Sequence, residues 1–180
     1  MNRTKLDQPI PDGLREIWAG QLAAESQTQQ AVPKIRRFVF RVGAEWFALD
    51  PRALSLTLPE IRPRQLPHRA GGVVEGLINA DGRIVVCIRM SHLWDILSSP
   101  TPTTQNRRIL VLNIDGWAFA LRAEDVLGIE EFAEDAIDPL SPSAPEALRR
   151  CAQGTMFHKG RAVSLLQAGP FAEEVRKKLQ

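Results

Sequence analysis

The chain has 180 residues, of which 44% are hydrophobic, and a formal net charge of +2. This length allows one sizeable domain or two small ones. The basic residues are scattered in pairs and form no basic stripe, which argues against a nucleic-acid-binding surface. Cys87 and Cys151 are far apart and belong to no CxxC motif, so they indicate a reducing compartment rather than a disulfide framework.

Residues 1–33 predict a helix followed by a polar linker. Asp12 can cap a helix whose apolar residues recur at helical spacing. These residues are Leu14, Ile17, Trp18 and Leu22. Such a short helix is unstable alone, so we expect it to pack on the body of the protein, on a partner or on a second protomer. The segment has no apolar signal region and the chain has no run long enough to span a membrane, so we expect a soluble cytoplasmic protein.

Short apolar runs separated by turn residues predict a mainly β fold for the rest of the chain. In its first half we expect strands at 35–42, 46–49 and 55–58, a hairpin at 73–88, and one or two helical turns at 91–97. The hairpin turns at 79–82, where Asp-Gly tolerates positive φ. A Pro- and Thr-rich linker, 98–105, separates the halves.

The second half repeats this order. We expect strands at 109–114, 117–121 and 126–132, a proline-containing surface loop at 133–145, and a second hairpin at 154–166. A final helix is expected at 171–180, with basic residues near its end, where the helix dipole favours cations.

Two motifs occur once in each half. They are Gly, five residues, Gly-Arg (76–83 and 154–161), and Arg-Arg followed at equal distance by Trp (36–46 and 107–117). The repetition predicts two similar β-barrels, residues 35–97 and 107–168. It also places Trp46 and Trp117 at equivalent positions, with at least one of them largely buried.

The sequence contains few candidate catalytic residues. The histidines are His68, His92 and His158, and Ser91 beside His92 points away from it in an extended chain, which disfavours a nucleophile–base pair. We therefore expect a binding protein and no enzyme. An alternative is a barrel that binds single-stranded nucleic acid through Arg36, Arg37, Phe38 and Arg41.

Several segments carry a family resemblance in their order and spacing. They are FRVG (40–43), WFALD (46–50), LPHR (66–69) and GLINADG (76–82), followed by 110–121 and 124–126. Over about residues 35–170 they resemble the CheW-type coupling proteins of bacterial chemosensory arrays. LPHR and IVVC (84–87) are most similar to the coupling proteins of Wsp-type surface-sensing systems.

The resemblance implies a fold and a role. The fold is two SH3-like five-stranded β-barrels with short helices, N- and C-terminal helices, and a hydrophobic groove between the barrels. This divides the chain into an N-terminal helix and linker (1–33), a CheW-like domain (34–170) and a C-terminal helix (171–180). The implied role is to couple the cytoplasmic tip of a methyl-accepting chemoreceptor to the regulatory domain of a CheA-type histidine kinase, without catalysis, cofactor, metal or nucleic acid, and with membrane contact only through receptors.

The resemblance also points to partner-binding residues. They are Leu56, Asn79, Asp81, Arg83, Arg89 and Val126. Asp81 stands where the family often has Arg, Leu56 where it often has Glu, and Arg89 where Asp is common. We therefore expect Asp81, together with Arg83 and Arg89, to match a partner surface of reversed charge.

Overall fold

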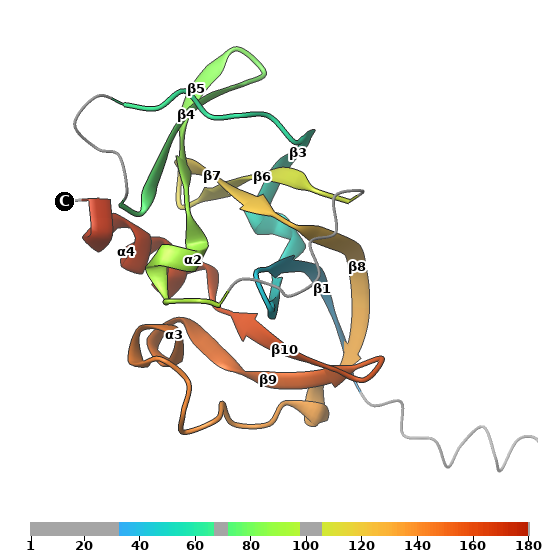
Figure 1. The fold of residues 1–180 in the computed structure, drawn as a ribbon. Helices are drawn as coiled ribbons and strands as arrows, with labels where there is room; N and C mark the ends of the chain where they lie inside the picture. The colour runs from blue at the N-terminus through green and yellow to red at the C-terminus, as the bar shows by residue number, and fades with distance from the viewer. Residues whose placement is uncertain (1–32, 67–71, 98–105, 180) are drawn as a thin grey trace, which may run out of the picture. The chain divides into compact units, whose positions relative to one another are not determined.

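The computed structural model of the chain describes residues 33–66, 72–97 and 106–179 (Figure 1). The chain divides into units Met1–Pro33 and Lys34–Gln180, and all the described elements belong to the second. The helix expected around residues 12–22 lies outside the described residues.

In the described residues ten strands form two five-stranded sheets, which confirms the mainly β prediction. Sheet A has the order β8-β1-β2-β10-β9 and sheet B the order β3-β6-β7-β5-β4. The strands of sheet A are β1 (Lys34–Val42), β2 (Glu45–Leu49), β8 (Asp125–Ala133), β9 (Ala152–His158) and β10 (Arg161–Leu166). Those of sheet B are β3 (Leu54–Pro59), β4 (Val74–Ala80), β5 (Arg83–Ile88), β6 (Arg108–Ile114) and β7 (Trp117–Ala123).

Short helices connect and follow the strands. They are η1 (Pro51–Ala53), α2 (Met90–Leu93), η2 (Glu134–Ala136), α3 (Glu146–Cys151) and α4 (Ala168–Leu179). The C-terminal helix begins at Ala168, before the predicted start at 171, and α3 falls at the end of the predicted surface loop. Each Gly-Arg hairpin is thus followed by a helix, α2 after β5 and α4 after β10.

Three hairpins turn on the same two-residue unit, a residue in the left-handed region followed by glycine. The pairs are Asp81-Gly82 (φ 51° and 80°), Asp115-Gly116 (51° and 76°) and Lys159-Gly160 (49° and 76°). Two successive positive φ values characterise the type I′ turn, whose twist matches that of the strands it joins. The second glycine of the repeated motif is therefore a turn residue.

The two sequence copies exchange strands, which differs from the prediction of one barrel for each copy. Hairpin β1–β2 of the first copy lies between β8 and β10 of the second, while hairpin β6–β7 lies between β3 and β5 of the first. The exchanges include two parallel pairings, β2 with β10 and β5 with β7. The sheets are also open rather than closed barrels, because in the described residues no ladder joins β8 to β9 or β3 to β4.

Each open sheet is instead linked across its gap by one isolated bridge. In sheet B the loop after β3 returns to edge strand β4, where Arg64 and Leu77 exchange two backbone hydrogen bonds of 2.8 Å. In sheet A the loop after β8 returns to edge strand β9, where Asp138 and Thr155 exchange bonds of 2.8 and 2.7 Å. We call residues 60–66 and 137–145 the β3–β4 and β8–β9 crossing loops.

The first glycine of the repeated motif permits this crossing. A Cβ on Gly76 would lie 2.4 Å from the Arg64 carbonyl oxygen, and one on Gly154 would lie 2.5 Å from that of Asp138. Gly76 also has a φ of 152°, which disfavours a side chain. The pairing register shifts beside both glycines, between Val74 and Gly76 and between Leu165 and Leu166. In both copies of the motif, the first glycine thus leaves room for the crossing loop and the second forms the hairpin turn.

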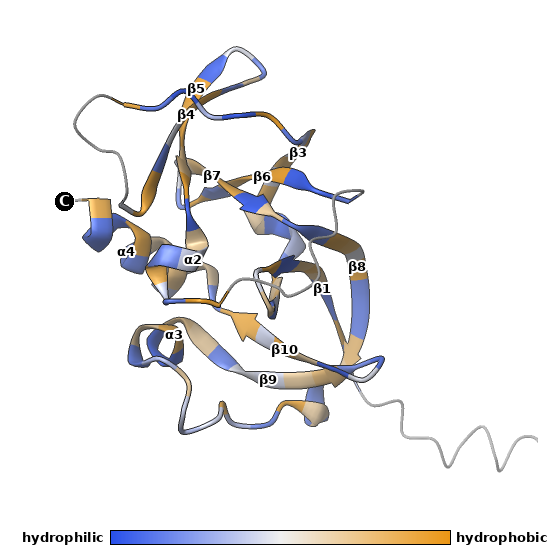
Figure 2. Cartoon of the chain, in the orientation of Figure 1, coloured by the Kyte–Doolittle hydropathy of each residue, from blue (hydrophilic) through white to orange (hydrophobic). Residues whose placement is uncertain are grey.

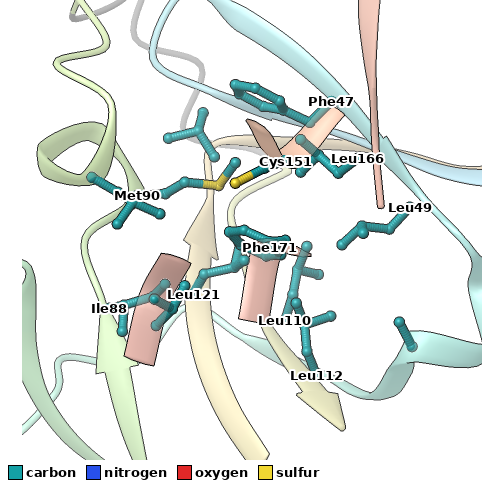
Figure 3. Close-up of a cluster of buried hydrophobic side chains, with 14 of the residues drawn as sticks. Phe47, Leu49, Ile88, Met90, Leu110, Leu112, Leu121, Cys151, Leu166 and Phe171 are labelled. Atoms are coloured by element: carbon teal, nitrogen blue, oxygen red, sulfur yellow. The ribbon is translucent and has the colours of Figure 1, made fainter. Parts of the chain in front are cut away.

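Apolar side chains form one cluster shared by the two sheets and one smaller cluster in each sheet. The shared cluster combines Phe47 of sheet A with Ile88 and Leu110 of sheet B around Phe171 of α4 (Figure 3). Figure 2 shows the corresponding apolar stretches along the inner strands and polar residues at the turns and on α4. Because the clusters are continuous across the strand exchange, neither sequence copy has a complete core of its own.

The tryptophan prediction is wrong in both of its parts. Trp46 occupies the second rung of its hairpin, opposite Arg41, whereas Trp117 occupies the first rung of its own, so the two do not correspond. Both remain partly exposed, with arginine guanidinium groups stacked over the rings. Among the tryptophans that the structure describes, the buried one is Trp94, only 2% exposed, which packs between Phe47 and Phe171.

The close contact at Gly154 predicts that alanine lowers the stability of the protein there but not at Gly169. Gly154→Ala places a methyl group against the Asp138 carbonyl, and we expect a loss of about 1–3 kcal/mol in the free energy of unfolding. Gly169→Ala is the matched control, because a Cβ there meets nothing within 4 Å and alanine favours helix α4. Denaturant unfolding of both variants measures the difference. An unchanged stability of Gly154→Ala would contradict the close crossing.

Candidate partner-binding surfaces

Three of the six predicted site residues lie together at the tip of hairpin β4–β5. Asn79, Asp81 and Arg83 are all exposed there. The Asn79 side-chain oxygen accepts a hydrogen bond of 2.9 Å from the backbone N–H of Gly82, which stabilises the turn. Asp81 has no ion pair among the described residues. The tip therefore exposes one negatively charged side chain, Asp81, and one positively charged side chain, Arg83.

The other three predicted residues lie elsewhere. Leu56 of β3 packs against the cluster of sheet B, and Val126 of β8 packs against the shared cluster opposite Phe40. Arg89 follows β5, and its Nη1 lies 3.2 Å from Nδ1 of His92. A strand of six residues separates it from the tip by roughly 20 Å. The six residues therefore do not form one compact site, and three of them share the tip of β4–β5.

Each edge hairpin exposes one large apolar side chain on the rung near its tip. In β4–β5 the rung pairs Asn79 with Ile84, which is 66% exposed. In β9–β10 it pairs Phe157 with Ala162, and Phe157 is 71% exposed. Sequence reasoning missed Phe157, although alignment of the two Gly-Arg motifs places it at the position of Asn79.

A groove of about 520 Å³ lies beside β9 and is walled by the β8–β9 crossing loop. Its apolar lining includes Trp94, Leu97, Leu140 and Phe157. Leu97 is 80% exposed, so together with Phe157 it gives the groove two solvated apolar side chains. Exposed apolar groups gathered around a concavity are typical of protein interaction sites.

The tip of β9–β10 differs electrostatically from that of β4–β5. Lys159 donates to Glu130 of β8 at 3.2 Å, and Nε2 of His158 lies 3.0 Å from the same carboxylate. The Lys159 hydrogen bond is the main cause that holds the pKa of Glu130 below its usual value. The charge of Lys159 is therefore matched within the protein.

Two hollows flank the β3–β4 crossing loop. One, of about 490 Å³, is mainly apolar and is lined by Ile61, Leu77 and Ile84. The other, of about 610 Å³, is lined by four arginines and two glutamates. These lining charges are Arg62, Arg89, Arg107, Arg122, Glu60 and Glu75. The crossing loops thus border all three concavities.

In the described part of the chain no three His, Cys, Asp or Glu side chains gather to hold a metal ion. Burial raises the pKa of the Cys87 thiol to about 12, with a further contribution from Glu75, so Cys87 stays protonated at neutral pH. None of the described helices is long and apolar enough to cross a membrane.

Comparison with known proteins identifies the family. The family model for the CheW-like domain matches residues 36–175, so the chain belongs to the CheW-like domain family. The fold is similar to that in the crystal structure of the scaffolding protein TtCheW from Thermoanaerobacter tengcongensis. The TM-score is 0.63 at 20% sequence identity, over 78% of this chain and 88% of that one. No curated protein sequence matches the chain.

Proposed function

We propose that the chain is a chemosensory coupling adaptor that binds the cytoplasmic tip of a methyl-accepting receptor and the regulatory domain of a CheA-type histidine kinase. The observation that carries this proposal is the CheW-like family match over residues 36–175. The resemblance of 66–69 and 84–87 to Wsp-type coupling proteins supports a finer proposal, a role in a surface-sensing system.

An adaptor needs two separate docking surfaces, and the two edge hairpins supply candidates. Hairpin β4–β5 belongs to sheet B and β9–β10 to sheet A, and they lie at opposite ends of the view in Figure 1. Ile84 and Phe157 supply apolar contact area, which favours affinity. The charges at the tips differ, which favours discrimination between partners.

The nucleic-acid alternative loses two of the four side chains on which it rested, while Arg36 stays exposed and Arg37 half-buried. Phe38 is buried in the shared cluster and offers no stacking face. Arg41 is buried as well, and its Nη1 donates to the Gly43 carbonyl at 2.7 Å and pairs with Glu124 at 3.4 Å. A single-strand platform needs exposed aromatic rings beside free cations.

The groove beside β9 generates a test of the adaptor proposal. We expect Phe157→Ser to weaken binding of one partner about tenfold, or about 1.4 kcal/mol, and to leave the other unchanged. Ile129→Ser is the matched control, because Ile129 is an exposed apolar residue of sheet A that does not line the groove. Calorimetric titration with the kinase regulatory domain and with a receptor-tip fragment measures both affinities. Equal affinities for wild type and Phe157→Ser would remove the groove from the proposal.

A second test concerns the charge of Asp81. The equivalent residue of the second hairpin is Lys159 at φ 49°, so a lysine fits this turn, and Asp81→Lys should change stability by less than about 0.5 kcal/mol. We expect about tenfold weaker binding to the partner that contacts this tip, with the loss largest at low salt. Asp81→Asn, which removes the charge without reversing it, should fall between. If both variants bind both partners like wild type, the tip lies outside the interfaces.

A further inference from the structure

The hollow with four arginines has more positive charge than the protein itself neutralises. Glu75 pairs closely with Arg122, with 2.6 Å between Oε1 and Nη2. Oε1 of Glu60 lies 3.6 Å from Nη1 of Arg107 and 3.8 Å from Nε of Arg122. Both carboxylates are thus engaged with Arg107 and Arg122.

The remaining two arginines line the same hollow without a carboxylate. Among the described residues neither Arg62 nor Arg89 has an ion pair, and the polar side-chain contact of Arg89 is with the ring of His92. The lining charges therefore leave a net charge of +2. Each guanidinium presents a planar fork of donors that matches a carboxylate or a phosphoryl group.

The internal ion pairs also leave hydrogen-bonding capacity unused. The Nε atoms of Arg107 and Arg122 are buried and have no hydrogen-bond acceptor, and Nε of Arg122 lies 3.8 Å from Oε1 of Glu60. Buried donors without acceptors are costly and uncommon in folded proteins. An anion entering the hollow would supply acceptors to the arginines and allow the loosely held Glu60 contacts to rearrange.

The neighbouring apolar hollow indicates that a fitting anion also carries an apolar group. Ile61 and Arg62 line both hollows, so the cationic and apolar surfaces are continuous around the β3–β4 crossing loop. Ile84 adds a solvated apolar side chain on the far side. The loop that separates the hollows is held against β4 by the Arg64–Leu77 bridge, which makes the paired surface a built feature.

We propose that this face binds an acidic amphipathic segment of a partner protein, with an apolar side chain in the apolar hollow and carboxylates on Arg62 and Arg89. A small free anion would use only the cationic hollow and leave the apolar one empty. A nucleic-acid strand is disfavoured because Glu60 and Glu75 would face its phosphates. The inference does not depend on which receptor or kinase the chain couples.

The test uses a synthetic probe and the full chain. The probe is a short fluorescein-labelled peptide of Leu, Glu and Ala that places Leu on one face and Glu beside it. Fluorescence anisotropy compares wild type with the double variant Arg62→Gln/Arg89→Gln, and we expect at least about tenfold weaker binding for the variant. Ile84→Ser should weaken binding as well, and added salt should reduce the difference between wild type and the double variant.

Arg149→Gln is the matched control for charge. Arg149 is an exposed arginine of α3 outside the hollow, so this variant should bind the probe like wild type. Melting curves of all variants show whether the fold is kept, and replacing each peptide Glu by Gln tests the carboxylates directly.

Three results would overturn the proposal. They are equal binding of the Glu and Gln peptides, equal affinity of the wild type and the double variant, and absence of peptide binding. A final experiment measures whether inorganic pyrophosphate binds to the protein. If it binds at the arginines while the peptide does not, the hollow is a small-anion site and the docking proposal fails. The assay contains no receptor or kinase, so failure of this proposal would leave untouched the family match that carries the coupling proposal.

Discussion

The surfaces of this protein depend on a loop that crosses an edge strand where a glycine leaves room for it. The crossing occurs twice, at Gly76 in sheet B and at Gly154 in sheet A, each with a pair of backbone hydrogen bonds. An open five-stranded sheet would otherwise present a row of unpaired edge groups, which invites aggregation. The crossing loops occupy part of each edge and form walls of the three concavities described above.

Exchange of strands between the two sequence copies supports these surfaces. Each edge hairpin is joined to its sheet by a short parallel pairing with a hairpin of the other copy, and the shared cluster then packs both sheets against α4. Neither sequence copy can therefore complete a sheet by itself, and each edge hairpin depends on strands of the other copy. This arrangement suits the proposed adaptor role, because the two edges are supported by one core.

Local patterns in the sequence were sufficient to predict most of the strands. Asp-Gly and Lys-Gly between apolar runs mark the turns, because few other residue pairs accept two positive φ values. The exchange of strands could not be predicted, because an apolar run does not specify which distant run it pairs with. The tip of β4–β5 was predicted from a family resemblance. The paired hollows were missed because Arg62, Arg89, Arg107 and Arg122 come from separate segments that only the crossing loop and sheet B bring together.

If the two crossing loops border docking surfaces for different partners, each partner should contact a different loop. Hydrogen exchange of the full chain, measured with the kinase regulatory domain and then with a receptor-tip fragment, tests it most directly. We expect one partner to slow exchange around 137–145 and Phe157, and the other to slow exchange around 60–66 and Ile84. Protection of the same loop by both partners, or of neither loop by either, would contradict it.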